Sequence, residues 1–181
     1  MEPKQMTRRP RIQNARRTAE NLIDRFQINS SPVDVNYIAK SLGLQVVYNA
    51  LGDDISGLLV TRDGTAAVCV KESDPLVRQR FTIAHEIGHF CLKHQELGDH
   101  VHVDEGWKVS ARSTHTTTGL DPMEVEANQF AAALLMPGSL VRERAQDFGT
   151  TQLDDLHVSA LAKEFKVSEQ AMAIRLSVLG L

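Results

Sequence analysis

Residues 80–89 read RFTIAHEIGH and contain the pattern His-Glu-x-x-His at residues 85–89. Apolar residues recur at helical spacing around this pattern, so we expect it on a long helix from about residue 75 to residue 94. Residues four apart lie on one face of a helix. The imidazoles of His85 and His89 can therefore converge on one Zn²⁺ ion, at about 2.0–2.1 Å from each nitrogen.

The glutamate inside the pattern has a different expected role. Glu86 follows the first histidine, where its carboxylate can reach a water on the metal without binding the metal itself. Zinc lowers the pKa of such a water towards about 7, and a neighbouring carboxylate can accept the proton. The hydroxide can then attack a peptide carbonyl that the metal polarises. The pattern thus predicts peptide hydrolysis with Glu86 as the general base.

Two histidines leave a catalytic zinc site short of one protein ligand. An extended pattern with a third histidine fails, because Leu92 and Gln95 stand where it requires glycine and histidine. The alternative is a carboxylate from a following helix, expected over residues 121–136, which carries Glu124 and Glu126. These two glutamates flank the apolar stripe of that helix on opposite sides, so helical geometry alone does not choose between them.

The neighbours of each candidate give some further indication of the third ligand. Glu124 has Asn128 one turn later on the same face, a pair that is typical of a metal ligand with a hydrogen-bonding partner. A flexible loop holds a ligand poorly, which counts against six further candidates. These are His94, Asp99, His100, His102, Asp104 and His115. For the group that stabilises the oxyanion, His115, Tyr37 and Tyr48 are possibilities without support.

The pattern of the whole chain predicts an α+β fold. Helices are expected over residues 13–27, 32–42, 75–94, 121–136, 138–147, 153–165 and 168–179, the second opening at Pro32 with Ser31 as its cap. Strands are expected over residues 44–51, 55–60 and 65–70, with a tight turn at Arg62-Asp63-Gly64. We expect the last strand, Thr65 to Val70, to be an exposed edge on which a substrate strand can pair. Residues 96–120 show no period and predict a functional loop.

Composition and charge limit the class of protein. The chain has 181 residues, 42% of them hydrophobic and 24% charged, which predicts one globular domain with room for a small appendage. Its net charge of −3 is uneven, because residues 1–17 carry +5 and the rest is acidic. An acidic body is a poor nucleic-acid binder. No apolar stretch is long enough to span a membrane. Two cysteines without a pairing motif indicate a reducing compartment.

The last thirty residues have the cadence of a helix-turn-helix. The run from Leu161 to Val167 predicts one helix, and Ser168 is a plausible cap for the next. Binding to DNA requires a basic face on the second helix, but residues 152–181 carry a net charge of −1. We therefore expect these helices to pack on the catalytic body or to dock a protein partner rather than to contact DNA.

Taken together, these residues resemble the ImmA/IrrE family of zinc metallo-endopeptidases. The resemblance is carried by residues 80–89 and by EVEANQFAAALLMP at residues 124–137, and it covers about residues 13–181. It implies that Glu124, four residues before the asparagine, is the third zinc ligand beside His85 and His89.

The resemblance also implies an architecture. It indicates a zincin-like α+β domain in which a small three-stranded sheet packs on the helix that carries the His-Glu-x-x-His pattern. We expect a flexible basic arm over residues 1–12, the metallopeptidase domain over residues 13–150 and a C-terminal helical appendage over residues 151–181.

The family resemblance further implies a function. Members are intracellular bacterial or phage proteins, and well-known ones act on helix-turn-helix repressors, so we expect a cytoplasmic anti-repressor that cleaves such a partner. Two alternatives remain at this point. One is a metal-dependent sensor that binds the repressor without cleaving it, and the other is a DNA-binding regulator that uses the C-terminal helices. Nothing in the sequence determines the oligomeric state.

Overall fold

The structure is a computed structural model that describes residues 8–51, 55–62, 65–94, 101–103, 107–110, 121–150 and 152–181. These residues form an α+β fold, as predicted. The helices are α1 (Ile12–Arg25), α2 (Val35–Ser41), α3 (Leu76–Cys91), α4 (Pro122–Leu135), α5 (Gly138–Gln146), α6 (Asp155–Phe165) and α7 (Glu169–Leu179). The strands are β1 (Leu44–Asn49), β2 (Gly57–Arg62), β3 (Thr65–Lys71), β4 (Val101–Val103) and β5 (Trp107–Ser110).

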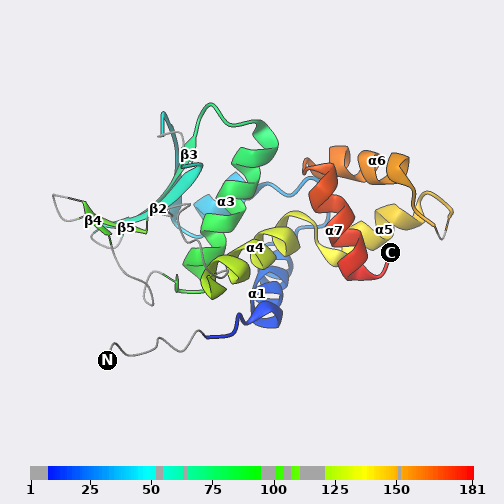
Figure 1. Ribbon diagram of the computed structural model, residues 1–181, viewed down its shortest axis with the longest axis horizontal. Coiled ribbons are helices and arrows are strands. Elements are labelled where there is room, and N and C mark those ends of the chain that lie inside the picture. Colours follow the sequence, from blue (N-terminus) through cyan, green and yellow to red (C-terminus); the bar gives the residue numbers. More distant parts are fainter. Residues whose placement is uncertain are drawn as a thin grey trace, which may run out of the picture.

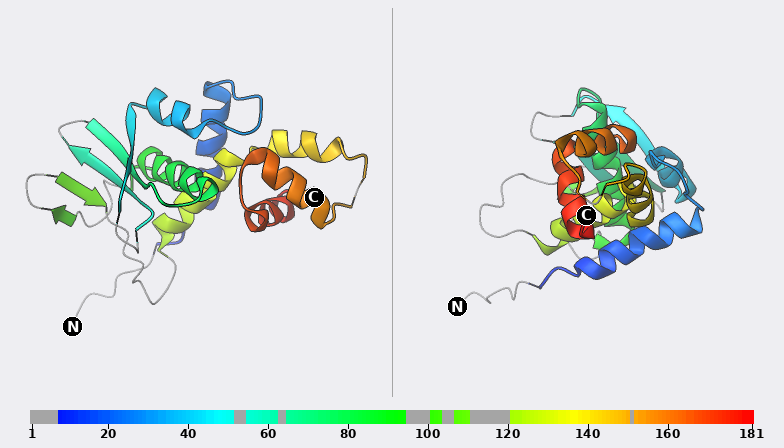
Figure 2. Two further views of the ribbon diagram at one scale, coloured as in Figure 1. Left: turned by 90° about the horizontal axis from the view of Figure 1, so that it is seen from above. Right: turned by 90° about the vertical axis from the view of Figure 1, so that its right-hand side faces the viewer.

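The elements form three groups along the longest axis of the molecule. The sheet lies at one end, α5, α6 and α7 lie at the other, and α3 and α4 lie between them (Figures 1 and 2). Helix α1 packs along α4, and α3 contacts both β2 and β3. The helix with the His-Glu-x-x-His pattern is therefore covered on one side by the sheet and on another by α4.

The sheet corrects one prediction about the substrate. Its strand order is β1-β3-β2-β5-β4, in which β1 pairs with β3 in parallel and the other pairs are antiparallel. The strand over Thr65–Lys71 is thus paired on both sides and offers no free edge, contrary to our expectation. Its alternate residues Ala66, Val68 and Val70 are buried towards the core, which explains why its sequence is apolar.

Residues 96–120 are not irregular throughout. Strands β4 and β5 lie within this range and extend the predicted three-stranded sheet to five strands. Short strands of three and four residues carry too little periodicity to be recognised in a polar stretch.

Among the residues that the structure describes, no helix is both long enough and apolar enough to cross a membrane.

The centre of the core is the contact between α3 and α4. Gly88 of α3 faces Phe130 of α4, whose side chain is fully buried. A Cβ atom on Gly88 would lie 3.0 Å from Cδ1 of Phe130, so the missing side chain allows the two helices to approach closely. This distance matters for the site, because the predicted metal ligands come from both helices.

Helix α1 agrees with its sequence prediction, whereas helix α2 begins three residues later than predicted. In α1 the buried residues are Ala15, Ala19, Leu22 and Ile23, the face that the spacing predicted. Helix α2 begins at Val35 rather than at Pro32, because the side chain of Asp34 accepts a hydrogen bond from Tyr37 N–H and caps it. The expectation that Ser31 caps this helix was wrong.

The C-terminal helices pack on the rest of the chain. Leu161, Phe165 and Met172 belong to the same buried cluster as the α3–α4 contact. Arg175 of α7, only 5% exposed, donates from Nε to the carbonyl oxygen of Met136 at 2.9 Å, where α4 ends. Packing on the body agrees with our expectation for this region, while the domain boundary at residue 150 stays a prediction.

Candidate metal centre

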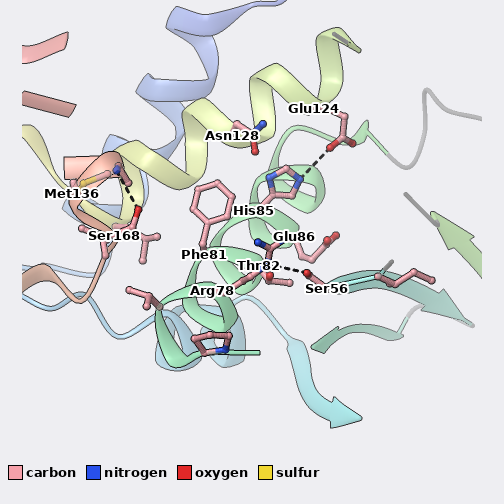
Figure 3. A pocket seen from close by; sticks show the side chains of 17 residues that line it. Ser56, Arg78, Phe81, Thr82, His85, Glu86, Glu124, Asn128, Met136 and Ser168 are labelled. Atoms are coloured by element: carbon pink, nitrogen blue, oxygen red, sulfur yellow. Dashed lines mark hydrogen bonds and ion pairs between the residues drawn. The ribbon is translucent and has the colours of Figure 1, made fainter. Parts of the chain in front are cut away.

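Three side chains from two helices bring their ligand atoms together, and Figure 3 shows two of them, His85 and Glu124. His85 and His89 project from α3, one turn apart, and their Nε2 atoms are 3.2 Å from each other. Glu124 in the first turn of α4 places Oε2 3.4 Å from Nε2 of His85 and Oε1 3.4 Å from Nε2 of His89. All the ligand atoms of this cluster lie within 4.8 Å of one another.

The spacing of these atoms fits a tetrahedral metal ion. Two ligands at 2.0–2.1 Å from a tetrahedral ion lie about 3.3–3.4 Å from each other. The three separations in the cluster are 3.2, 3.4 and 3.4 Å. Two imidazoles and one carboxylate form a donor set that suits zinc and leaves a fourth position for water or substrate. The residues present therefore fit the metal that the sequence predicts.

Local sequence explains the position of Glu124. The side chain of Asp121 accepts a hydrogen bond from Met123 N–H, and Pro122 occupies the first turn, so α4 starts here. Glu124 then lies in the first turn of the helix, where a negative side chain is favourable. Further along the two helices, Gly88 of α3 packs against Phe130 of α4 and keeps the helices close together.

Glu86 lies beside the cluster and is almost completely buried, with 2% of its surface exposed. It lines the same pocket as His85 and Glu124 (Figure 3). Gly57 at the start of β2 passes close to it, since a Cβ at that position would lie 3.7 Å from Oε1 of Glu86. Burial raises the pKa of the nearby Cys69 thiol, and the charge of Glu86 raises it further.

Glu126, the other candidate for the third ligand, points away from the cluster. Its Oε1 accepts a hydrogen bond from the Arg8 guanidinium and another, at 2.6 Å, from the backbone N–H of Arg11. Its Oε2 is 3.1 Å from Nε2 of His94, and Nδ1 of His94 is 3.0 Å from Nδ1 of His89. Glu126 thus reaches the cluster indirectly, through His94, which contacts His89.

These contacts explain the ionisation of the buried pair. Burial alone would raise the pKa of Glu126, but hydrogen bonds from Arg11, Arg8 and His94 outweigh it and hold the pKa below its usual range. Burial lowers the pKa of His94, against the opposing effect of Glu126. A charged carboxylate beside a neutral imidazole is the state that both shifts favour.

Sequence reasoning did not find this set of contacts. His94 was considered only as a weak ligand, and the basic residues before α1 had no assigned role. The contacts of Glu126 with Arg8 and Arg11 join positions 118 and 115 residues apart, a separation that no local pattern reports. A hint was present in His94, which closely follows the second histidine of the pattern in an otherwise helical run.

Comparison with known families settles the relationship of the chain. The Peptidase M78 family model, described as the IrrE N-terminal-like domain, matches residues 39–177. The chain belongs to this family. The ImmA/IrrE resemblance drawn from residues 80–89 and 124–137 is thereby confirmed, and so is the predicted α+β fold. The site residues themselves rest on the geometry above.

A solved structure supports the fold of this M78 chain. It is described as a Mycobacterium tuberculosis transcriptional regulator and matches with a TM-score of 0.60 at 16% sequence identity. The match covers 91% of the M78 chain but 47% of the regulator, so the chain spans about half the length of that protein. No curated protein matches the chain.

A pocket of about 600 Å³ opens beside the cluster and reaches the C-terminal helices of the M78 chain (Figure 3). His85, Glu86 and Glu124 line one end. The rest of its wall includes both polar and apolar side chains, and the apolar ones include Phe81, Leu135, Met136, Val167 and Ala171. Asn128 lies on the wall one turn after Glu124. The pocket thus joins the candidate metal centre to the turn between α6 and α7.

The remaining candidates lie elsewhere. Tyr37 packs edge-on against Phe26, and Tyr48 places its hydroxyl 3.4 Å from Oδ1 of Asn36. Neither tyrosine lines the pocket, so the structure gives them no part in stabilising an oxyanion. Asp99, His100, Asp104 and His115 lie outside the described residues, as does the side chain of His102.

The thiol of Cys91, two residues after His89, makes a testable marker of the native core. Burial raises its pKa to about 12. At pH 8 the reactive thiolate is then scarcer than in an exposed cysteine by about 10³-fold. In a Cys69→Ser variant, Cys91 is the single remaining thiol. We expect it to react with Ellman's reagent about 10³ times more slowly than glutathione in the native protein. After denaturation it should react fully. A native rate within tenfold of glutathione would contradict this environment.

Proposed function

We propose that this M78 chain is a zinc-dependent endopeptidase. The observation that carries the proposal is the 3.2–3.4 Å spacing of the His85, His89 and Glu124 ligand atoms, next to a buried Glu86 at the wall of a pocket. A chance cluster of surface carboxylates and histidines has no reason to adopt tetrahedral spacing. Nor would such a chance cluster have the carboxylate of Glu86, which is not one of the ligands, beside a pocket that can hold a substrate.

Each side chain has a defined task in this proposal. His85, His89 and Glu124 hold the metal, which polarises the substrate carbonyl and lowers the pKa of a water when it is bound there. Glu86 accepts the proton of the attacking water and later gives it to the leaving amine. The burial of Glu86 strengthens its electrostatic interactions, because little bulk water screens them.

The pocket supports a preference for an extended substrate segment with a large apolar side chain. Phe81, Leu135 and Met136 add apolar side chains to the wall of the pocket that Glu86 lines, and the volume of about 600 Å³ exceeds that of any single side chain. Val167 and Ala171 close the wall from the α6–α7 turn and α7. The C-terminal helices would then take part in substrate selection rather than in contacts with DNA.

The family resemblance further supports a helix-turn-helix repressor as the substrate, and with it a cytoplasmic, gene-regulating role. The decisive test uses the purified chain with Zn²⁺ and a candidate helix-turn-helix repressor, chosen from the genes next to its own. We expect one or a few discrete cleavage products, which disappear when a chelator removes the metal and return when Zn²⁺ is added back. Stable binding of an uncut repressor by the metal-loaded chain would favour a non-catalytic anti-repressor instead.

Filling the pocket from its far wall tests the role of α7. We expect Ala171→Trp to lower kcat/KM by at least ~10-fold, because one misfitting group in an apolar pocket has an effect of this size. The metal content should stay unchanged, since Ala171 lies on the pocket wall outside the ligand set. Ala173→Trp on the exposed face of the same helix is the matched control. Equal cleavage by both variants would show that the substrate does not enter this part of the pocket.

A further inference from the structure

A continuous line of contacts runs from the residues before α1 to the candidate metal centre. The Arg8 guanidinium and the Arg11 N–H both donate to Oε1 of Glu126. The other oxygen of Glu126 is 3.1 Å from Nε2 of His94, whose Nδ1 is 3.0 Å from Nδ1 of His89. Glu126 is fully buried and His94 is 3% exposed, so water cannot readily replace these partners.

The donors and acceptors along this line have one consistent arrangement. Both groups at Oε1 of Glu126 can only donate, so the carboxylate accepts there and, being charged, also accepts at Oε2. Nε2 of His94 must therefore carry a proton, and in a neutral ring Nδ1 of His94 is left as an acceptor. His89 then donates from Nδ1, which leaves the lone pair of its Nε2 directed at the cluster.

We propose that Arg8, Arg11, Glu126 and His94 form a positioning relay that fixes His89 as an Nε2 ligand. This inference rests on the proposed metal site and extends it, because it makes the segment before α1 part of that site. None of the four is a catalytic residue. They act through His89, by holding its ring orientation and the position of its proton, as hydrogen-bonding partners of metal-ligating histidines do.

The relay gives the basic segment a role that net charge alone did not suggest. The side chain of Arg8 is 39% exposed, whereas its partner Glu126 has no exposed surface. The outer end of the relay is thus accessible while the inner end is sealed. Displacing Arg8 removes one of the two donors at Oε1 of Glu126, so the position of this segment controls how firmly His89 is held.

The isosteric variant Glu126→Gln reverses the relay. If the amide oxygen keeps the contacts with Arg8 and Arg11, the amide NH₂ faces Nε2 of His94, which must then accept. His94 donates from Nδ1, and the proton of His89 moves to Nε2, the atom that faces the metal. We expect Zn²⁺ affinity, measured by competition with a chelating indicator, to fall by ~10–100-fold. The visible spectrum of the Co²⁺-loaded protein should change as well.

A double-mutant cycle separates the relay from a general loss of packing. His94→Phe removes the acceptor for His89, so it should weaken metal binding by itself, and adding Glu126→Gln to it should change the affinity by less than about twofold. Arg8→Ala should lower the affinity more than its exposed neighbour Arg9→Ala, which is the matched control. Thermal unfolding of each metal-free variant reports whether the fold is intact.

The outcomes distinguish this inference from the proposed function. If wild-type protein binds Zn²⁺ and Glu126→Gln binds it equally well, the relay is wrong and the metal site stands. If Arg8→Ala and Arg9→Ala bind equally, the segment before α1 has no part in it. If the wild-type chain binds neither Zn²⁺ nor Co²⁺, the proposed function fails and the relay fails with it.

Discussion

Replacing Glu86 with glutamine should abolish repressor cleavage and leave metal binding intact. Glutamine keeps the size and shape of the side chain, so the buried space between α3 and Gly57 of β2 stays filled. It cannot accept a proton from water, and loss of a general base typically lowers the rate by ~10²–10⁴-fold. His85, His89 and Glu124 are untouched, so zinc content should stay at the wild-type level.

The measurement is single-turnover cleavage of the purified repressor, together with the metal content of each preparation. Glu169→Gln, an exposed change of the same chemistry in α7, is the matched control and should cleave at the wild-type rate. Glu124→Gln should also lose activity, but through loss of metal rather than loss of the base. Wild-type cleavage by the Glu86→Gln variant would exclude the proposed mechanism.

The parts of the candidate site that depend on local spacing can be proposed from the sequence. His85, Glu86 and His89 share one turn of a helix, so their relative positions follow from helical geometry once the apolar period is recognised. The third ligand was different, because Glu124 and Glu126 are equivalent with respect to the apolar stripe of α4. Family resemblance favoured Glu124, and the distances of 3.4 Å to both histidines now give a physical reason for that choice.

Features that depend on distant partners could not be predicted. The central position of β3 follows from its pairing with β1 on one side and β2 on the other, which a single strand pattern does not encode. The buried state of Glu126 likewise depends on Arg8 and Arg11, which precede α1. A glutamate next to an apolar stripe is usually solvated, and only tertiary contacts distinguish this one from a surface charge.

The second large effect concerns the close contact between α3 and α4. We expect Phe130→Ala to lower the free energy of unfolding by about 3–5 kcal/mol, the usual cost of removing a fully buried phenylalanine. Chemical denaturation of the metal-free protein measures this loss. Phe148→Ala, whose ring is 36% exposed and packs against His157, is the control and should cost about 1 kcal/mol. A change at Phe130 as small as that at Phe148 would contradict this packing.

The same contact should link stability to the metal centre. A Cβ on Gly88 would lie 3.0–3.3 Å from three atoms of Phe130, so Gly88→Ala must displace the ring or the helix that carries it. Because α4 also carries Glu124, such a shift moves one ligand relative to His85 and His89. Alanine ordinarily stabilises a helix interior by about 1 kcal/mol relative to glycine. We expect this gain in stability only when Gly88→Ala is combined with Phe130→Leu, because the smaller leucine makes room for the new methyl group. Gly88→Ala alone should lower the affinity for Zn²⁺. Unaltered affinity and a full gain in stability for the single variant would show that the spacing of the two helices is not set here.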